Sequence, residues 1–409
     1  MRCLFLLPIA AATFDAARWL GGECGQPPGR SVIVVETRFM QGQGRFRALV
    51  GARLEQMLAV TVPSMAAQTN RCFVWLVSTD PALPAGPRAR LEAALPAHAR
   101  LVDAPRGVDA TYAPGKNVTS LLATAFPGLR ARLAAADELT LVTLDADDAL
   151  HRSYVQHVAR WRRSAPPLSA AATFDYACAN RAMAWLSSKD VGARARRSAD
   201  AEVRQQHHAV YLETLPRGCL MSGLAHALAL VGGDLRACAP APCPVLAGAG
   251  KARDAPKGAA LGRVPLVLAV GHKTARDAYD VHGVEIDAGG DFDPGDVATA
   301  PVLRVRSVTS TGGKHPRNVS KLRRPASSRR IASAFGIKAE DLVSLTRYLQ
   351  RHEAAVAREM VGDKAATGCN DAFFGSCASK NALAFASEVI ARHPPPAQHR
   401  LLRFTRAGT

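Results

Sequence analysis

Patterns typical of strands and of helices alternate four times between residues 31 and 163, and this alternation limits the possible folds more than any other feature. Apolar or β-branched runs predict strands at Val32–Val35, Cys72–Asp80, Arg100–Asp103 and Leu139–Asp148. Helical spacing follows these runs at Ala48–Met65, Arg88–Leu95, Asn117–Ala136 and His151–Arg163. Because βαβ units place their strands in parallel, we predict an α/β fold with a mostly parallel, Rossmann-like sheet flanked by helices.

Proline and glycine interrupt two of these helices, and the second half of the chain is less regular. Pro63 bends or restarts the first helix, and Pro127-Gly128 breaks the third. Further on, the patterns predict a strand within Ala170–Ala184, an apolar helix at Cys219–Leu230, strands at Val264–Thr274 and Val302–Ser310, and helices at Ala339–Met360 and Asn381–Arg392. We therefore expect the sheet to be followed by a helical C-terminal extension.

The chain has 409 residues, which is enough for one large domain with an appendage. Cys3–Phe14 is apolar, contains small residues and follows one positive charge, so we predict a signal peptide over residues 1–22. The alternative for this segment is a buried first helix or strand. We expect the sheet domain at residues 30–313, a basic linker at 314–330 and the helical extension at 331–409.

Cysteines and glycosylation sequons fit the same compartment. Removal of the signal peptide with Cys3 would leave eight of the nine cysteines, and an even number suits disulfides. The local pairs are Cys238 with Cys243 and Cys369 with Cys377. Asn117-Val-Thr and Asn318-Val-Ser are acceptor sequons. These features predict the secretory pathway, either the Golgi lumen or the outside of the cell.

The strong positive charge limits the partners but selects none. Lys and Arg number 52 against 34 Asp and Glu, which gives a formal charge of +18. Such a charge favours phosphates, nucleic acid or anionic glycans. The basic residues are dispersed except at Lys314–Arg330, without interleaved aromatic residues, so we do not expect a nucleic-acid partner. No run of about 18 apolar residues exists, so we expect no transmembrane span.

Three acids follow the fourth predicted strand directly, as Asp145-Ala-Asp147-Asp148. The carboxyl ends of strands in open parallel sheets are where ligands bind. Carboxylates at i and i+2 suit Mn²⁺ or Mg²⁺ that already carries phosphate oxygens, and such a metal neutralises a diphosphate leaving group. The alternative is an acidic turn that caps the helix beginning near His151, with Asp148 as part of the cap.

Several motifs arrive together in the order of a known family. TRF at Thr37–Phe39, VPSMAAQTNRCFVWLVSTD at Val62–Asp80 and LVTLDADDALHRSYVQHV at Leu141–Val158 resemble the glycosyltransferases of the GT-A fold. Among these, the chain is similar to the group called putative rhamnosyltransferases. The resemblance implies a hexosyltransferase-type enzyme that moves a sugar, with rhamnose as one option, from a nucleotide-sugar donor to a glycan or glycoconjugate acceptor.

The resemblance also implies roles for matching positions. Thr37, Arg38 and Phe39 would lie at the nucleotide end of the first strand, and Asp80 would face the base or ribose. Lys116 stands beside Gly115 at a helix start, where a cation suits phosphate. Asp145 and Asp147 would hold the metal and the diphosphate, with Asp148 in support. For Asp80 the alternative is a turn residue before Pro81, and for Lys116 an ordinary surface lysine.

Two parts of the expected site stay open. A further metal ligand is expected at His315 or at His272, each of which follows a predicted strand. An inverting enzyme also needs a carboxylate base, and nothing in the sequence ranks the candidates, which are Glu213, Asp234, Asp277 and Asp280.

Other functions compete with glycosyl transfer. A phosphatase-like hydrolase also carries D-x-D after an apolar strand, but there the motif normally ends the first strand of its domain. A glycan-binding protein that lost catalysis would keep the fold, although intact Asp145 and Asp147 argue against that loss. Dependence of donor turnover on Mn²⁺ separates these classes.

Overall fold

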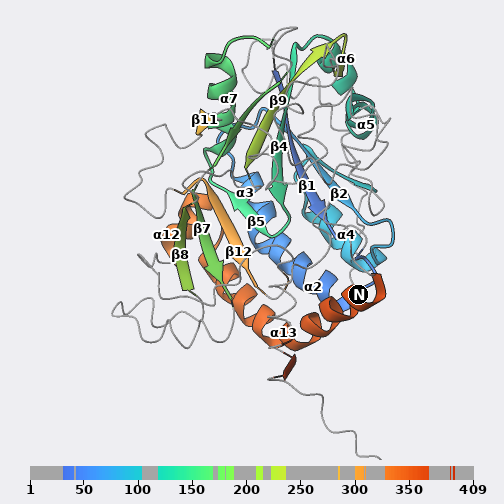
Figure 1. The fold of residues 1–409 in the computed structure, drawn as a ribbon, viewed down its shortest axis with the longest axis vertical. Coiled ribbons are helices and arrows are strands. Elements are labelled where there is room, and N and C mark those ends of the chain that lie inside the picture. The colour runs from blue at the N-terminus through green and yellow to red at the C-terminus, as the bar shows by residue number, and fades with distance from the viewer. Residues whose placement is uncertain are drawn as a thin grey trace, which may run out of the picture.

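The computed structural model places its described residues in two sheets with helices around them (Figure 1). The described residues are 31–40, 43–103, 118–168, 174–179, 181–187, 209–214, 223–235, 284–285, 300–307, 309, 328–367, 387, 390 and 391. The larger sheet has the strand order β11-β6-β9-β4-β1-β2-β3, with β10 paired to β9. The smaller sheet has the order β5-β12-β7-β8.

Four neighbouring parallel strands form one side of the larger sheet, as the sequence predicts. They are β1 (Ser31–Phe39), β2 (Val74–Thr79), β3 (Ala99–Asp103) and β4 (Glu138–Asp145). β1 lies between β2 and β4 and is parallel to both. Val32–Val35 and Leu139 are at most 3% exposed. The predicted α/β class with a mostly parallel central sheet is therefore confirmed.

The prediction of a helix at Cys219–Leu230 is wrong, because this segment supplies a strand. β9 (Leu224–Val231) lies antiparallel to both β4 and β6 (Phe174–Cys178). Large side chains alternate with alanine along β9, at Leu224, His226, Leu228 and Leu230. This period of two suits a strand buried on both faces, and it outweighs the helix propensity of the alanines. Two short strands complete the sheet, β10 (Asp234–Leu235) and β11 (Val284–Glu285).

A continuous helical segment follows β1 and changes its winding before Pro63. It consists of α2 (Arg47–Gln56), the π-helix η2 (Met57–Thr61) and α3 (Val62–Ala66). Pro63 has no N–H group, so the regular helical hydrogen-bond ladder cannot continue through it. Of the two predicted effects of Pro63, a bend or a restart, the structure shows a restart: α3 begins at Val62 after the π-helix, with Pro63 in its first turn. One buried cluster joins this segment to residues of β1, β2 and β4, for example Val35, Trp75 and Val142.

The other predicted helices of the first half are present. They are α4 (Ala85–Ala94), α5 (Val118–Ala125), α6 (Leu129–Ala134) and α7 (Tyr154–Ser164). Gly128 separates α5 from α6 with a φ of 82°, which confirms the predicted break. α7 begins three residues after His151, with Ser153 as its N-cap residue.

The smaller sheet begins immediately after β4. It contains β5 (Asp148–Leu150), β7 (Arg181–Leu186), β8 (Ala209–Thr214) and β12 (Val302–Arg306). β12 pairs with β5 in antiparallel fashion and with β7 in parallel. The predicted strand at Val302–Ser310 is confirmed in β12, whereas no sequence pattern predicted the three-residue β5.

The C-terminal helices pack against the first half of the chain (Figure 1). They are α12 (Ser328–Phe335) and α13 (Ala339–Thr367), and α13 confirms the predicted helix at Ala339–Met360. Glu359 accepts the main-chain N–H groups of Ala48 and Leu49 at 3.1 and 2.8 Å, so it caps the N-terminus of α2. Gly336, with a φ of 66°, ends α12, and a β-carbon there would lie 2.0 Å from that of Ala67.

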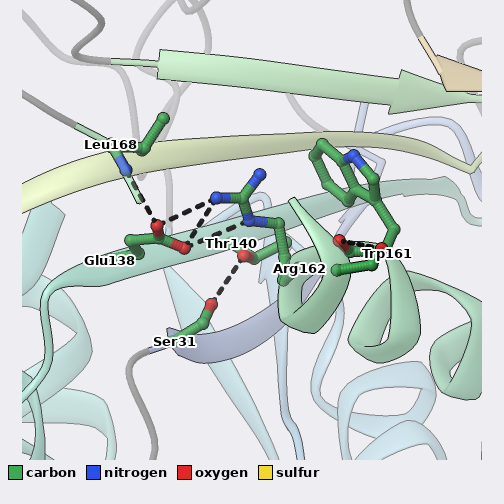
Figure 2. A network of polar contacts seen from close by, with 7 residues as sticks. Ser31, Glu138, Thr140, Trp161, Arg162 and Leu168 are labelled. Carbon is green, nitrogen blue, oxygen red and sulfur yellow. Dashed lines mark hydrogen bonds and ion pairs between the residues drawn. The ribbon is translucent and has the colours of Figure 1, made fainter. Parts of the chain in front are cut away.

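A buried ion pair lies at the amino end of β4 (Figure 2). The Arg162 guanidinium on α7 contacts both carboxylate oxygens of Glu138 at 2.9 Å, and both side chains are at most 2% exposed. The N–H of Leu168 donates to the same carboxylate at 3.3 Å. Ser31 and Thr140 join β1 to β4 nearby through a hydroxyl pair at 2.8 Å. Every charge in this group is therefore met by an opposite charge or a hydrogen bond.

Several predictions fall outside the described residues and stay predictions. They concern the signal peptide, the four cysteines of the two proposed pairs, both sequon asparagines, the strand at 264–274, most of the linker and nearly all of the helix at 381–392. Among the described helices, none combines the length and apolar character needed to cross a membrane.

Candidate active site

The three acids of the sequence motif come together at the carboxyl end of β4. Asp145 ends β4, Asp147 lies in the turn, and Asp148 begins β5. One carboxylate oxygen from each lies within 4.8 Å of the other two. Asp145 and Asp147 are partly exposed, whereas Asp148 is 2% exposed. Like charges this close repel unless a cation shares them, and hard oxygen donors suit Mg²⁺ or Mn²⁺, so the donor set fits such an ion.

Asp148 also fastens the turn to the smaller sheet. One of its carboxylate oxygens accepts the N–H of Val305 at 3.2 Å, and the other lies 3.9 Å from Nε of Arg304. Asp148 and Arg304 are register partners of β5 and β12. The alternative of a helix cap is not what the structure has, because the N-cap of α7 is Ser153. Asp145 and Asp147 therefore offer the more exposed carboxylates.

The two family motifs contact one another across more than 80 residues of sequence. Gln68, from the motif Val62–Asp80, donates to the carbonyls of Leu150 at 3.4 Å and His151 at 3.0 Å. Its side-chain oxygen accepts the N–H of Val155 at 3.1 Å. The N–H of Thr69 donates to the carbonyl of Arg152 at 2.8 Å. These bonds explain why the motifs occur together: the helical segment 57–66 and its exit hold the strand and turn that follow the acids.

The end of β1 presents two different faces. Thr37 is buried and accepts the indole N–H of Trp75 at 2.9 Å, and Phe39 is fully buried in the core. Arg38 is partly exposed and lies in register with Asp145 on β4 and Ser78 on β2. Register partners point to the same face of a sheet, so the structure brings Arg38 beside the first acid. Of the three predicted residues, Arg38 is the one that lies with the acids.

Asp80 has a structural task in the described chain. One carboxylate oxygen accepts the N–H of Gly44 at 2.9 Å, and the other accepts the N–H of Ala82 at 2.8 Å. A β-carbon on Gly44 would lie 2.9 Å from the main chain of Ala82, so the two loops pack closely. Asp80 thus joins the loop after β1 to the turn after β2, which is the turn-residue alternative. Contact with the base or ribose stays a prediction.

The remaining predicted site residues either lie outside the described residues or belong to other strands. Lys116, His272, His315, Asp277 and Asp280 lie outside the described residues. Of the other two candidates for the base, Glu213 is on β8 and Asp234 on β10. The catalytic base therefore stays unassigned.

The sequence patterns did not single out Glu36 or Thr61, which both lie near the acids. Glu36 is 1% exposed and lies two residues before Arg38 on β1, so it shares the face of Arg38 and Asp145. A charged residue inside the run SVIVVETRF was a usable signal. Thr61 contacts the acidic turn from η2, but no local pattern marks it, because the contact joins positions 85 residues apart.

A match to a protein-family model supports the resemblance seen in the motifs. Residues 47–227 match the family model described as "Putative rhamnosyl transferase". This segment runs from α2 into β9, so it contains the acidic turn, Thr61 and Gln68, whereas Arg38 precedes it. The resemblance implied by the motifs is therefore confirmed for this segment, which is less than half of the chain.

Comparison with other proteins adds little to this match. Mouse xyloside xylosyltransferase 1 in its apo form is a similar solved structure, with 12% identity over 49% of this chain and 68% of that chain. Its TM-score is 0.23, which is too low to support a conclusion about fold or function. No curated protein matches the chain.

Proposed function

We propose that the chain is a metal-dependent glycosyltransferase that moves a sugar from a nucleotide-diphosphate donor to a hydroxyl of a glycan or glycoconjugate. The observation that supports this most is the acidic turn at the carboxyl end of β4, with three carboxylate oxygens within 4.8 Å of one another. The turn lies inside the segment that matches the rhamnosyltransferase model. Open parallel sheets bind ligands at this edge.

This proposal gives a role to each acid of the turn and to three basic residues elsewhere in the chain. Asp145 and Asp147 would hold Mn²⁺ or Mg²⁺, which when bound supplies Lewis-acid neutralisation of the departing diphosphate. Arg38, in register with Asp145, offers a guanidinium to the diphosphate oxygens. Asp148 keeps the turn fixed to β12 through the N–H of Val305. Lys116 and His315 stay proposed contacts of the donor and the metal.

The donor sugar and the compartment are finer parts of the proposal. The description of the matching family names rhamnosyl transfer, so activated rhamnose is the first donor to test, together with common nucleotide hexoses. We place the reaction in the secretory pathway because Cys3–Phe14 has the composition of a signal peptide. An acceptor glycan with a free hydroxyl completes the reaction.

A panel of nucleotide sugars tests this function. Purified protein is incubated with each donor, with Mn²⁺ or with a chelator, and the released nucleotide is measured with and without glycan acceptors. We expect one donor to give nucleotide release that requires the metal and rises with an acceptor. Phosphate release from simple phosphoesters would favour the hydrolase instead. Glycan binding without turnover of any donor would favour the inactive glycan-binding protein.

A further inference from the structure

Thr61 touches the acidic turn from the helical segment that follows β1. Its side-chain oxygen lies 2.8 Å from the carbonyl oxygen of Ala146 and 2.8 Å from that of Asp148. Thr61 is completely buried. The hydroxyl has one hydrogen, which the two carbonyls share. The first carbonyl belongs to the peptide group before Asp147 and the second to the peptide group after Asp148, so one side chain holds the main chain on both sides of these two acids.

The π-turn places Thr61 at this position. The N–H of Val62 donates to the carbonyl of Met57, five residues earlier, which is the wider winding of a π-helix. In a regular α-helix the ring of Pro63 would meet the carbonyl of Ala59. The π-turn avoids this collision and rotates the residues around it relative to a continuous α-helix. The hydroxyl of Ser64 donates to the carbonyl of Thr61 at 2.9 Å, and this bond links the π-helix to the first turn of α3.

We infer that Thr61 is a positioning residue for the metal and diphosphate site, an inference that rests on the proposed function. The hydroxyl fixes the peptide group before Asp147 and the peptide group after Asp148, and the main chain held between them sets the direction in which the Asp147 carboxylate leaves the turn. A carboxylate held in one direction loses less conformational freedom when it binds an ion. Loss of the hydroxyl therefore weakens metal binding, although Thr61 does not touch the metal.

Direct metal binding tests this inference without any donor. Mn²⁺ affinity is measured by electron paramagnetic resonance, and thermal stability is measured without metal, for the wild type, Thr61→Val and Thr61→Ser. Valine keeps the shape and removes the hydroxyl, whereas serine keeps the hydroxyl. We expect Thr61→Val to weaken Mn²⁺ binding about tenfold, within the range typical of residues that orient metal ligands, and Thr61→Ser to stay within about twofold of the wild type.

Thr346→Val is the matched control for a buried threonine. Thr346 on α13 is also completely buried; it accepts the indole N–H of Trp185 at 3.2 Å and donates to the carbonyl of Leu342 at 2.9 Å. Its loss should lower thermal stability and leave Mn²⁺ affinity unchanged. Should Thr61→Val fail to fold, Thr61→Ala compared with Thr61→Ser isolates the same hydroxyl.

The outcomes separate this inference from the proposed function. Unchanged Mn²⁺ affinity in Thr61→Val, with weakened binding in Asp147→Asn, would overturn the role of Thr61 and leave the proposed metal site intact. Weakened binding in Thr346→Val to the same degree would reduce the effect to general destabilisation and also overturn it. A wild-type chain that binds no Mn²⁺ would overturn the metal site itself, and the inference with it.

Discussion

Both ends of β4 carry buried or half-buried carboxylates, but the charges around these carboxylates differ. At the amino end, Glu138 meets the guanidinium of Arg162 at 2.9 Å and the N–H of Leu168 at 3.3 Å (Figure 2). At the carboxyl end, three carboxylates gather within 4.8 Å, and the guanidinium of Arg304 lies 3.9 Å from Asp148. The first end pairs a single acid with an opposite charge, whereas the second gathers three acids in one turn, with Arg38 and Arg304 beside them.

This difference separates a structural end of the strand from a candidate binding end. A buried charge that is paired and hydrogen-bonded keeps a fold intact but has little left to offer a ligand. Carboxylates that crowd together raise the local negative potential, which an added cation relieves. Removing the charge of Glu138 or Arg162 should therefore destabilise the protein, whereas removing the charge of Asp145 or Asp147 should not.

The largest change in stability is expected from Arg162→Met. The substitution leaves Glu138 buried without its guanidinium partner, and breaking such a pair costs about 3–5 kcal/mol of unfolding free energy. Chemical denaturation measures the loss, and donor turnover per folded molecule should stay at the wild-type level. The double variant Glu138→Gln/Arg162→Met removes both charges and should recover most of the stability. A single variant as stable as the wild type would contradict the structural role of this end.

Gln68→Met should lower both stability and turnover, because Gln68 holds the chain just after the acids. Methionine has a similar volume but cannot bond the carbonyl of His151 or the N–H of Val155, so we expect a loss of about 2–3 kcal/mol. Turnover of the folded fraction should fall as well, unlike in Arg162→Met. Denaturation curves and nucleotide release on the same samples measure both effects. Normal turnover with reduced stability would separate Gln68 from the site.

His226 on β9 lies opposite Leu141, near the middle of β4. We expect this histidine to make a smaller, pH-dependent contribution to the stability of the protein. Burial lowers the pKa of His226 from 6.5 to about 3. Below pH 6.5 the unfolded chain therefore takes up a proton that the folded chain does not, so stability falls as the pH falls. At pH 5 this contribution amounts to about 2 kcal/mol.

His226→Leu should therefore lose less stability between pH 6.5 and pH 5 than the wild type does. Thermal unfolding across this range measures the slope. Burial also lowers the pKa of His98, to about 4, so part of the slope should remain in the variant. An identical slope in both proteins would mean that His226 takes up its proton as readily in the folded chain as in the unfolded chain, which would contradict the lowered pKa.

Sequence patterns predicted the central sheet well, because each parallel strand is a local apolar run between helices. They failed where contacts with strands that are distant in the sequence determine the secondary structure. The apolar segment Cys219–Leu230 is predicted as a helix, but Leu224–Val231 lies between β4 and β6 and forms a strand. β5 has three residues and gives no periodic signal.

The candidate site was predictable to a similar degree. Asp145, Asp147 and Asp148 are adjacent in sequence, so their proximity followed from the motif. The contacts of Thr61 and Gln68 with this region join residues more than 80 positions apart, which no local pattern records. The sequence left two roles for Asp80, contact with the base or ribose and a turn residue before Pro81. Its hydrogen bonds to Gly44 and Ala82 fit the turn residue.

The measurement that tests the central claim most directly compares Asp147→Asn with the wild type. Asparagine keeps the size and one oxygen of aspartate but removes the charge, so it binds a divalent cation more weakly. Thermal stability without ligand should change little or rise, because repulsion within the turn is relieved. Mn²⁺-dependent nucleotide release should fall by orders of magnitude, at about 1.4 kcal/mol of barrier per tenfold. Wild-type release by Asp147→Asn would contradict the account, because the acidic turn would then be a structural feature only.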